Sequence, residues 1–158
     1  MQPTEIIAAL EAPTDDRRRL MWSLREDAPA EALAAALAAA EEPHTRQLLA
    51  DLLGFQAAPE GVPALIAALS DPAPGVRSSA ADALGKVFLA HPEAPGRDTA
   101  GAALLDRWGA EERTPVKHML AAALGATRHE PALGVLREAA EDADAGIRDS
   151  ARWALEQF

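Results

Sequence analysis

The sequence predicts an all-α fold, a short right-handed α-solenoid of about five helical hairpins. The composition is one reason: the 158 residues include 39 Ala and 20 Leu, against 5 Val, 4 Ile and no Tyr. β-Branched and aromatic residues, which half-buried strands favour, are therefore scarce. An internal repeat of roughly 30 residues is the second reason, because repeats of this length are typical of solenoids whose stacked units share one core.

The repeat is clearest in residues 71–85 and 142–156, which read DPAPGVRSSAADALG and DADAGIRDSARWALE. Each copy has a basic anchor residue and a Leu seven positions after it. The anchors are Arg17, Arg46, Arg77, Lys117 and Arg148, and the Leu residues are Leu24, Leu53, Leu84, Leu124 and Leu155. Neither Gly nor Pro occurs between an anchor and its Leu, which predicts helix interiors, because both residues are costly there.

Residues typical of helix ends flank these segments. Gly directly follows the Leu in the three inner copies, which predicts left-handed helix stops at these positions. Pro precedes four of the anchors, where a helix start tolerates the missing N–H. These residues are Gly54, Gly85 and Gly125, and Pro13, Pro43, Pro74 and Pro115.

A further apolar run with helical spacing precedes each anchor segment, at residues 5–10, 30–37, 62–69, 99–105 and 132–136. The repeated unit is therefore helix, turn, helix. We expect one domain, 1–158, with approximate units 1–27, 28–58, 59–95, 96–128 and 129–158. Arg77 and Lys117 are 40 residues apart, against 29 to 31 for the other anchors, which predicts a surface loop or an extended inner helix near 90–97.

The charge balance favours protein partners. The chain has 25 acidic and 15 basic residues, a formal net charge of −10. Nucleic-acid-binding proteins normally present a basic face, so nucleic acid and anionic membrane are disfavoured, although Arg17–Arg19 could form a local basic patch. There is no membrane-length apolar stretch, no secretory leader and no Cys for disulfides or thiolate metal sites. We expect a cytoplasmic protein.

The pattern of residues 71–85, an acid, an apolar residue followed by Arg, and then Ala-Ala-x-Ala-Leu-Gly, resembles the HEAT-like repeats of phycobilisome lyases. The resemblance covers essentially the whole chain when the degenerate copies are counted. It implies that the first helix of each hairpin lines the convex face, and that the second lines the concave face, which usually carries binding. It also implies an alternative function, a phycobilin-lyase-like role in attaching or chaperoning a chromophore.

An acid precedes each anchor by five or six residues, and the two can meet within or between units. We interpret these residues as a structural acid–base ladder that joins neighbouring units; the alternative is a functional basic row. The ladder residues are Glu11 and Arg17, Glu41 and Arg46, Asp71 and Arg77, Glu111 and Lys117, and Asp142 and Arg148.

Positions one, two and five after each anchor are expected to face outwards from the second helix, since the apolar positions alternate with them. The candidate partner-binding residues on this concave face are Arg18, Trp22, Leu48, Asp51, Asp82, His118, Met119, Asp149 and Trp153. Their mixture of apolar and acidic side chains predicts a basic or amphipathic protein segment as partner. Trp22 and Trp153 occupy equivalent positions in the first and last units, where they either contact a partner or cap the core.

No catalytic motif is present: the sequence lacks G-x-S-x-G, a Gly-rich phosphate loop and HExxH. His129-Glu130 resembles one of the His-Glu motifs of deoxyhypusine hydroxylase, a di-iron enzyme of similar repeats, but that enzyme needs several such pairs. A metal site needs three or four convergent ligands. The sequence therefore predicts a non-enzymatic scaffold with no metal and no cofactor.

Overall fold

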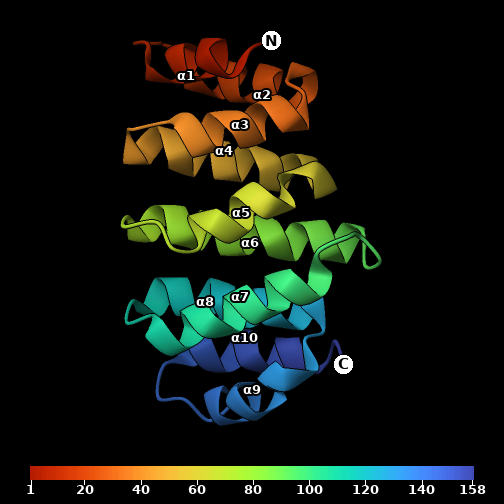
Figure 1. The fold of residues 1–158 in the computed structure, drawn as a ribbon. Coiled ribbons are helices and arrows are strands. Elements are labelled where there is room, and N and C mark those ends of the chain that lie inside the picture. Colours follow the sequence, from red (N-terminus) through yellow and green to blue (C-terminus); the bar gives the residue numbers. More distant parts are fainter.

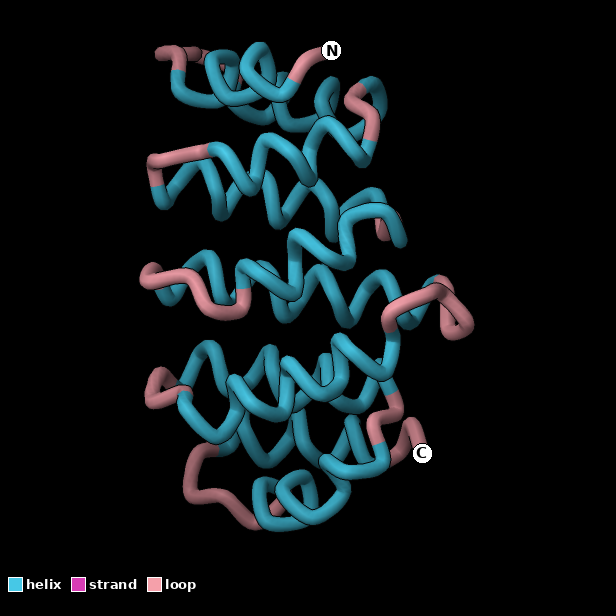
Figure 2. Tube along the Cα trace, viewed as in Figure 1, coloured by secondary structure: helices cyan, strands magenta, loops and turns pink.

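A computed structural model describes all residues, 1–158, and contains ten α-helices, two short 3₁₀ helices and no strand. The helices follow one another along an elongated stack, with α1 at one end and α9 and α10 at the other (Figure 1). Loops join successive helices and no strand is drawn anywhere in the trace (Figure 2). The prediction of an all-α solenoid is confirmed.

The helices alternate between two layers. The first helices of the hairpins are α1 (Pro3–Glu11), α3 (Ala30–Ala39), α5 (Val62–Ala68), α7 (Arg97–Ala110) and α9 (Leu133–Ala139). The second helices are α2 (Arg17–Asp27), α4 (Pro43–Gln56), α6 (Pro74–Ala90), α8 (Thr114–Thr127) and α10 (Ala145–Leu155). The 3₁₀ helices η1 (Pro59–Gly61) and η2 (Glu130–Ala132) lead into α5 and α9. None of these helices is both long and apolar enough to cross a membrane.

The second helices form the inner layer of the solenoid. α4, α6, α8 and α10 pack directly on one another, and their mutual contacts are much more extensive than those between successive first helices. The second helices therefore form one continuous side of the stack. We call this side the inner face. α2 contacts α4 less extensively, and the first hairpin is also joined to the second by the packing of α1 on α3 and α4.

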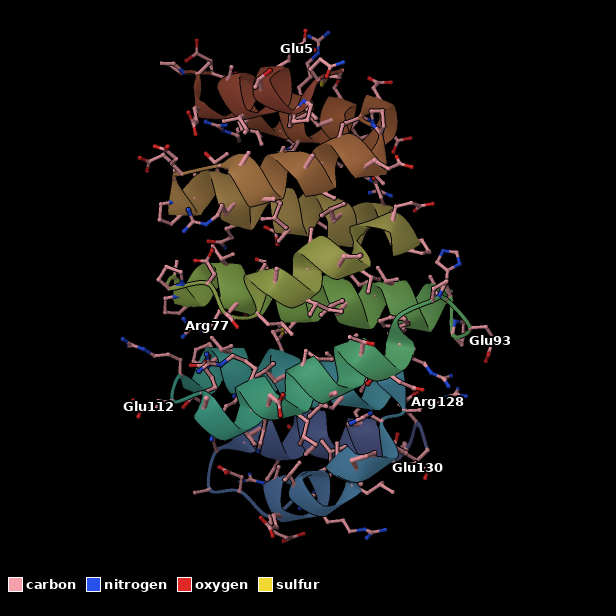
Figure 3. The ribbon with its side chains drawn as sticks, viewed as in Figure 1. Glu5, Arg77, Glu93, Glu112, Arg128 and Glu130 are labelled. Atoms are coloured by element: carbon pink, nitrogen blue, oxygen red, sulfur yellow. The ribbon has the colours of Figure 1, made fainter.

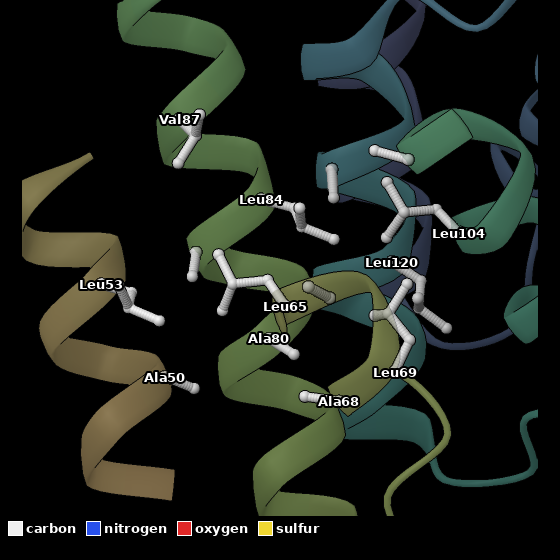
Figure 4. Packing of buried hydrophobic residues seen from close by; sticks show 14 of the residues in the cluster. Ala50, Leu53, Leu65, Ala68, Leu69, Ala80, Leu84, Val87, Leu104 and Leu120 are labelled. Carbon is white, nitrogen blue, oxygen red and sulfur yellow. The ribbon is translucent and has the colours of Figure 1, made fainter. Parts of the chain in front are cut away.

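The repeated Leu residues lie in a shared core. One cluster of 37 buried residues runs continuously from Ile6 in α1 to Ala154 in α10. Leu53 and Leu84 are fully buried within it, where Leu65 of α5 and Leu69, the residue directly after α5, pack in the same region (Figure 4). No hairpin can bury its apolar faces alone, so continuity of this core holds the stack together.

The glycines that follow the repeated Leu do not end their helices, which corrects that prediction. Gly54, Gly85 and Gly125 all lie inside α4, α6 and α8, and these helices continue beyond them. Left-handed caps with φ of 49° fall instead at Ala57 and Arg128, after α4 and α8.

These glycines serve close packing between second helices. A Cβ at Gly125 would lie only 2.4 Å from Cα of Ala154, and a Cβ at Gly54 would lie 3.0 Å from Cα of Ala83. The two alanines occupy the same repeat position in the following hairpin, six residues after the anchor. Gly against Ala therefore lets successive inner helices approach closely.

The long spacing between Arg77 and Lys117 reflects both alternatives that the sequence left open. α6 is the longest helix, 17 residues, and continues to Ala90. A loop over residues 91–96 then leads into α7 (Figure 2). The packing of α6 on both α4 and α8 is uninterrupted, so the extra residues project from one edge of the stack.

Candidate partner-binding face

Two anchor residues form ion pairs with the next hairpin. The guanidinium of Arg77 donates from Nε to Oε2 of Glu111 at 2.7 Å and from Nη2 to Oε1 at 3.0 Å. Arg46 donates in the same way to Asp71, at 2.6 and 3.1 Å. Arg77 lies at the edge where α6 meets the following hairpin (Figure 3). Each acid therefore pairs with the anchor of the preceding hairpin, and the two pairs join hairpins two, three and four.

Glu111 is the most strongly stabilised carboxylate of the chain. Its side chain is 1% exposed, and it also accepts hydrogen bonds from the main-chain N–H groups of Glu112 and Arg113. Burial by itself raises the pKa, but the hydrogen bonds and charge of Arg77, with help from Arg107 at 3.4 Å, outweigh burial and lower the pKa of Glu111 to about 2. The carboxylate is thus firmly ionised at neutral pH.

The remaining predicted ladder residues form no ion pair: Glu11, Arg17, Glu41, Lys117, Asp142 and Arg148. Arg148 instead donates to the main-chain carbonyls of Asp142 and Ala143, at 2.8 and 3.1 Å. The ammonium of Lys117 lies 5.0 Å from the ring centre of Trp108. Arg148 and Lys117 therefore contact groups within their own hairpin and form no ion pair with the next hairpin.

The first part of the inner face is a row of alternating rings and cations. The guanidinium carbon of Arg25 in α2 lies 5.4 Å from the ring centre of Trp22 and 5.9 Å from that of Phe55 in α4. The ammonium of Lys86 in α6 lies 5.0 Å from the Phe55 ring. Cations at such distances are attracted to aromatic faces. Trp22 and Phe55 are 63% and 49% exposed, so the row faces solvent.

Two carboxylates occupy the middle of the inner face. Oδ2 of Asp82 lies 2.6 Å from Nζ of Lys86, four residues later in α6. Asp51 of α4 is half-buried, and burial, reinforced by the charge of Asp82, raises the pKa of Asp51 above its usual range although Ser79 and Lys86 act against the shift. The charge of Asp82 is therefore partly neutralised by Lys86, and ionisation of Asp51 is unfavourable because Asp51 is half-buried next to a like charge.

A small apolar groove lies further along the inner face, between α6, α8 and α10. Its volume is about 70 Å³. Leu89, Met119 and Trp153 provide its large side chains, and one carboxylate, Asp82, borders it. The complete lining is Ala81, Asp82, Gly85, Leu89, Met119, Ala122, Ala123, Ala126 and Trp153. Small residues between large ones leave room for an apolar side chain of a partner.

The residues that directly follow the anchors Arg46 and Lys117 contact the next hairpin. The side chain of Gln47 covers Gly75, where a Cβ would lie 2.6 Å from its Oε1. His118 covers Gly146 in the same way, and its Nε2 lies 2.7 Å from Oδ1 of Asp144, the N-cap of α10. His118 therefore joins α8 to α10 and is only 28% exposed.

All nine predicted face residues lie on second helices. Arg18 and Asp149 are exposed, and Leu48 and Met119 are half-buried. The structure brings Asp51 close to Asp82 and Met119 close to Trp153. Trp22 and Trp153 stand on helices near opposite ends of the stack (Figure 1), and Trp153, 36% exposed, borders the groove.

Four further residues of the inner face lie outside the predicted positions: Arg25, Phe55, Lys86 and Leu89. Phe55, Lys86 and Leu89 were missed because the Gly after the repeated Leu was interpreted as a helix end, whereas Arg25 directly follows Leu24 and was not among the positions expected to face outwards. The signal was present in the sequence, since Asp82, Lys86 and Leu89 keep the spacing of four and three residues that marks one side of a helix, and this spacing passes through Gly85.

The His-Glu motif lies away from the inner face. His129 packs on α7 at Gly101, where a Cβ would lie 2.6 Å from Cγ of the imidazole. Glu130 begins η2 and is exposed at the edge of the stack (Figure 3). No group of three or more His, Asp or Glu side chains is arranged to hold a metal ion.

Comparison with known proteins agrees with this architecture. The family model for HEAT repeats matches residues 30–114, more than half of the chain. The chain therefore belongs to the HEAT-repeat family. A search of curated proteins gives no match. A similar solved structure is a chain of the complex of CpcE and CpcF of phycocyanin lyase from Nostoc sp. PCC7120, with a TM-score of 0.76 and 23% sequence identity over 99% of this chain. The match spans 65% of that longer chain and shows a shared fold.

Proposed function

We propose that the protein is a non-enzymatic interaction scaffold whose inner face binds a segment of another protein. One observation carries the proposal. Six large apolar side chains are exposed; Met1 and Phe158 are at the chain termini, and the other four all project from second helices. Those four are Trp22, Phe55, Leu89 and Trp153. Exposed apolar side chains gathered on one face mark interaction surfaces, and aromatic residues are enriched among binding hot spots.

The charges of the inner face favour an amphipathic segment with basic residues opposite Asp51 and Asp149. Lys86 already neutralises Asp82, whereas Asp149 is exposed and has no ion pair. Asp51 has a raised pKa because it is half-buried next to a like charge. A partner cation placed beside Asp51 would relieve that cost, so charge complementarity adds to the apolar contacts.

The test is partner capture from a lysate of the source organism with the wild type and two single variants. Trp153→Ala should weaken capture at least tenfold, about 1.4 kcal/mol, because it removes one wall of the groove. Phe158→Ala is the matched control, since it removes a similarly exposed ring at the chain terminus. Thermal melting of each variant accompanies the assay. A Trp153→Ala variant that melts much lower yet still captures the partner normally would identify Trp153 as a cap and refute the assignment.

A charge-reversal variant tests the polar part of the proposal. Changing Asp51 and Asp82 together to Lys should slow association with the partner and lose its effect at high salt, because exposed charges act mainly on encounter and are screened. Unchanged association at low salt would remove these carboxylates from the site.

A lyase-like role in chromophore attachment is a second candidate function. The shared fold with a chain of the phycocyanin lyase complex suggests it, and a shallow depression of about 750 Å³ beside Arg17–Arg19 and Trp22 offers space, cations and a ring. Titration of the protein with a free phycobilin, followed by absorbance, tests this role. A saturable spectral shift at one pigment per chain supports it, and an unchanged pigment spectrum excludes it.

A further inference from the structure

α2 carries a basic and aromatic stripe that stands out in an acidic chain. Arg18, Trp22 and Arg25 are spaced by four and three residues, which places them on one side of the helix, and all three are exposed. The side chain of Arg18 forms no ion pair and donates no hydrogen bond. The chain as a whole has a net charge of −10, so exposed cations on one side of a helix are a local departure from the surrounding charge.

The guanidinium of Arg25 lies over two aromatic rings and makes no hydrogen bond within the protein. It lies between the rings of Trp22 and Phe55, at 5.4 and 5.9 Å. It donates no hydrogen bond within the protein, and its one charged neighbour is the adjacent Glu26, at 3.5 Å, with both side chains about half exposed. A planar guanidinium placed in this way presents parallel N–H groups that match a carboxylate.

The surrounding contacts keep this arrangement in place across three hairpins. The amide Nε2 of Gln56 donates to the main-chain carbonyls of Arg25 and Ala28, at 2.9 and 2.8 Å, and so ties the end of α4 to the end of α2. Phe55 directly precedes Gln56, and the ammonium of Lys86 lies 5.0 Å from the centre of the Phe55 ring. Two cations therefore flank one exposed ring. Lys86 is already paired with Asp82 at 2.6 Å, so Arg25 is the cation at this ring that remains for a ligand.

We propose that this surface, formed by Arg18, Trp22, Arg25 and Phe55, binds the carboxylates of an acidic stretch in the partner protein. We call it the α2 patch. The inference rests on the proposed function and adds an orientation: the acidic stretch lies over α2 and α4, and the apolar anchor lies in the groove between α6, α8 and α10. Charge complementarity selects the occupant, and the rings bury the apolar residues beside the carboxylates.

The charge of the whole molecule favours a protein segment over nucleic acid. Asp15, Asp16, Glu26 and Asp27 lie within or next to α2. A short acidic stretch meets the cations of the α2 patch within about 10 Å, where screening is incomplete, whereas a long polyanion also experiences the surrounding negative field. Nucleic acid is therefore an outcome that the experiment must separate.

The experiment uses the full chain and three probes of equal length: a peptide of alternating Glu and Leu, the same peptide with Lys in place of Glu, and single-stranded oligo-dT. Binding is followed by NMR at the Nε–H of Arg25 and the indole N–H of Trp22. We expect the Glu peptide to shift both signals, and the affinity measured from these two signals to be about tenfold tighter for the Glu peptide than for the Lys peptide at low salt. Arg25→Gln should abolish this preference, while Arg137→Gln, which changes an exposed Arg on α9, should leave it unchanged.

Each other result overturns the inference in a recognisable way. Equal affinity for the Glu and Lys peptides removes charge selection, and tighter binding of oligo-dT identifies a phosphate site. If the Glu peptide shifts the indole N–H signal of Trp153 and not that of Trp22, the peptide carboxylates bind outside the α2 patch. Failure of the Glu peptide together with loss of partner capture in Trp153→Ala refutes the α2 patch alone. Normal capture by Trp153→Ala refutes the proposed function even where the Glu peptide binds.

Discussion

Removing the charge of Glu111 should cost a large part of the stability of the solenoid. The change Glu111→Gln keeps the shape of the side chain but leaves Arg77, which is 9% exposed, without its anionic partner. The folded protein lowers the pKa of Glu111 from 4.5 to about 2. Each pKa unit corresponds to 1.36 kcal/mol, so the ionised carboxylate contributes about 3 kcal/mol to the free energy of unfolding at neutral pH. A buried pair that loses one partner typically costs a similar amount.

The pH dependence gives the same prediction an independent signature. Because the folded pKa lies below the unfolded one, the contribution of Glu111 is complete above pH 4.5 and disappears as the pH falls towards 2. More than half of it should be lost by pH 3. Glu111→Gln has no such titration, so the stability difference between wild type and variant should shrink between pH 7 and pH 3.

Urea unfolding followed by circular dichroism at both pH values measures the difference. Glu112→Gln is the control, since Glu112 is the adjacent residue, is exposed and forms no ion pair (Figure 3). Its unfolding free energy should stay within about 0.5 kcal/mol of the wild type. A cost of Glu111→Gln below about 1 kcal/mol at pH 7, or an equal cost at both pH values, would contradict this role of the Glu111 carboxylate.

Three further predictions concern packing and charge. Arg77→Ala should destabilise the fold by about 1–3 kcal/mol and leave partner binding intact well below the melting temperature; unchanged stability with lost binding would make the basic row functional. Gly125→Ala should lower the melting temperature, because the added Cβ would lie 2.4 Å from Cα of Ala154. Gly109→Ala should raise the melting temperature, because Gly109 has open space around it and Ala favours a helix more than Gly does. Equal effects of the two substitutions would contradict close packing at Gly125. Asp51→Asn should raise the melting temperature at pH 7, because burial raises the pKa of Asp51 and makes its ionised form costly. At a pH below the ordinary pKa range of Asp, where Asp51 is protonated in both the folded and the unfolded chain, the substitution should leave the melting temperature unchanged.

The helices were predictable because the absence of Gly and Pro from a segment is a local property. The role of Gly125 was not, because a helix stop and a close helix contact use the same residue, and only Ala154 in the next hairpin distinguishes them. The wrong choice hid part of the inner face, including Phe55 and Leu89, which lie beyond the presumed helix ends. Side-chain periodicity carried past a glycine would have found them.

The ion pairs show a similar limit. Acid and base spacing predicts that Asp71 and Arg77 can meet, but it does not tell which atoms do so. In the structure Nη1 of Arg77 reaches the main-chain oxygen of Asp71, while the carboxylate of Asp71 faces Arg46 of the preceding hairpin. The pairing depends on how neighbouring hairpins stack, which no single repeat encodes.

The two largely buried ion pairs lie in the central three hairpins, and the junctions of the first and last hairpins have no such pair. Arg46 with Asp71 and Arg77 with Glu111 join hairpins two, three and four, whereas the outer junctions are held by neutral or solvent-exposed contacts such as Gln56 with α2 and His118 with α10. In a linear array each interface contributes separately to cooperativity, so we expect the terminal hairpins to open before the central three unfold. The terminal hairpins carry Trp22 and Trp153. A partner that spans the inner face would contact both terminal hairpins and the central three at once. We therefore expect the complex to unfold as a single cooperative unit.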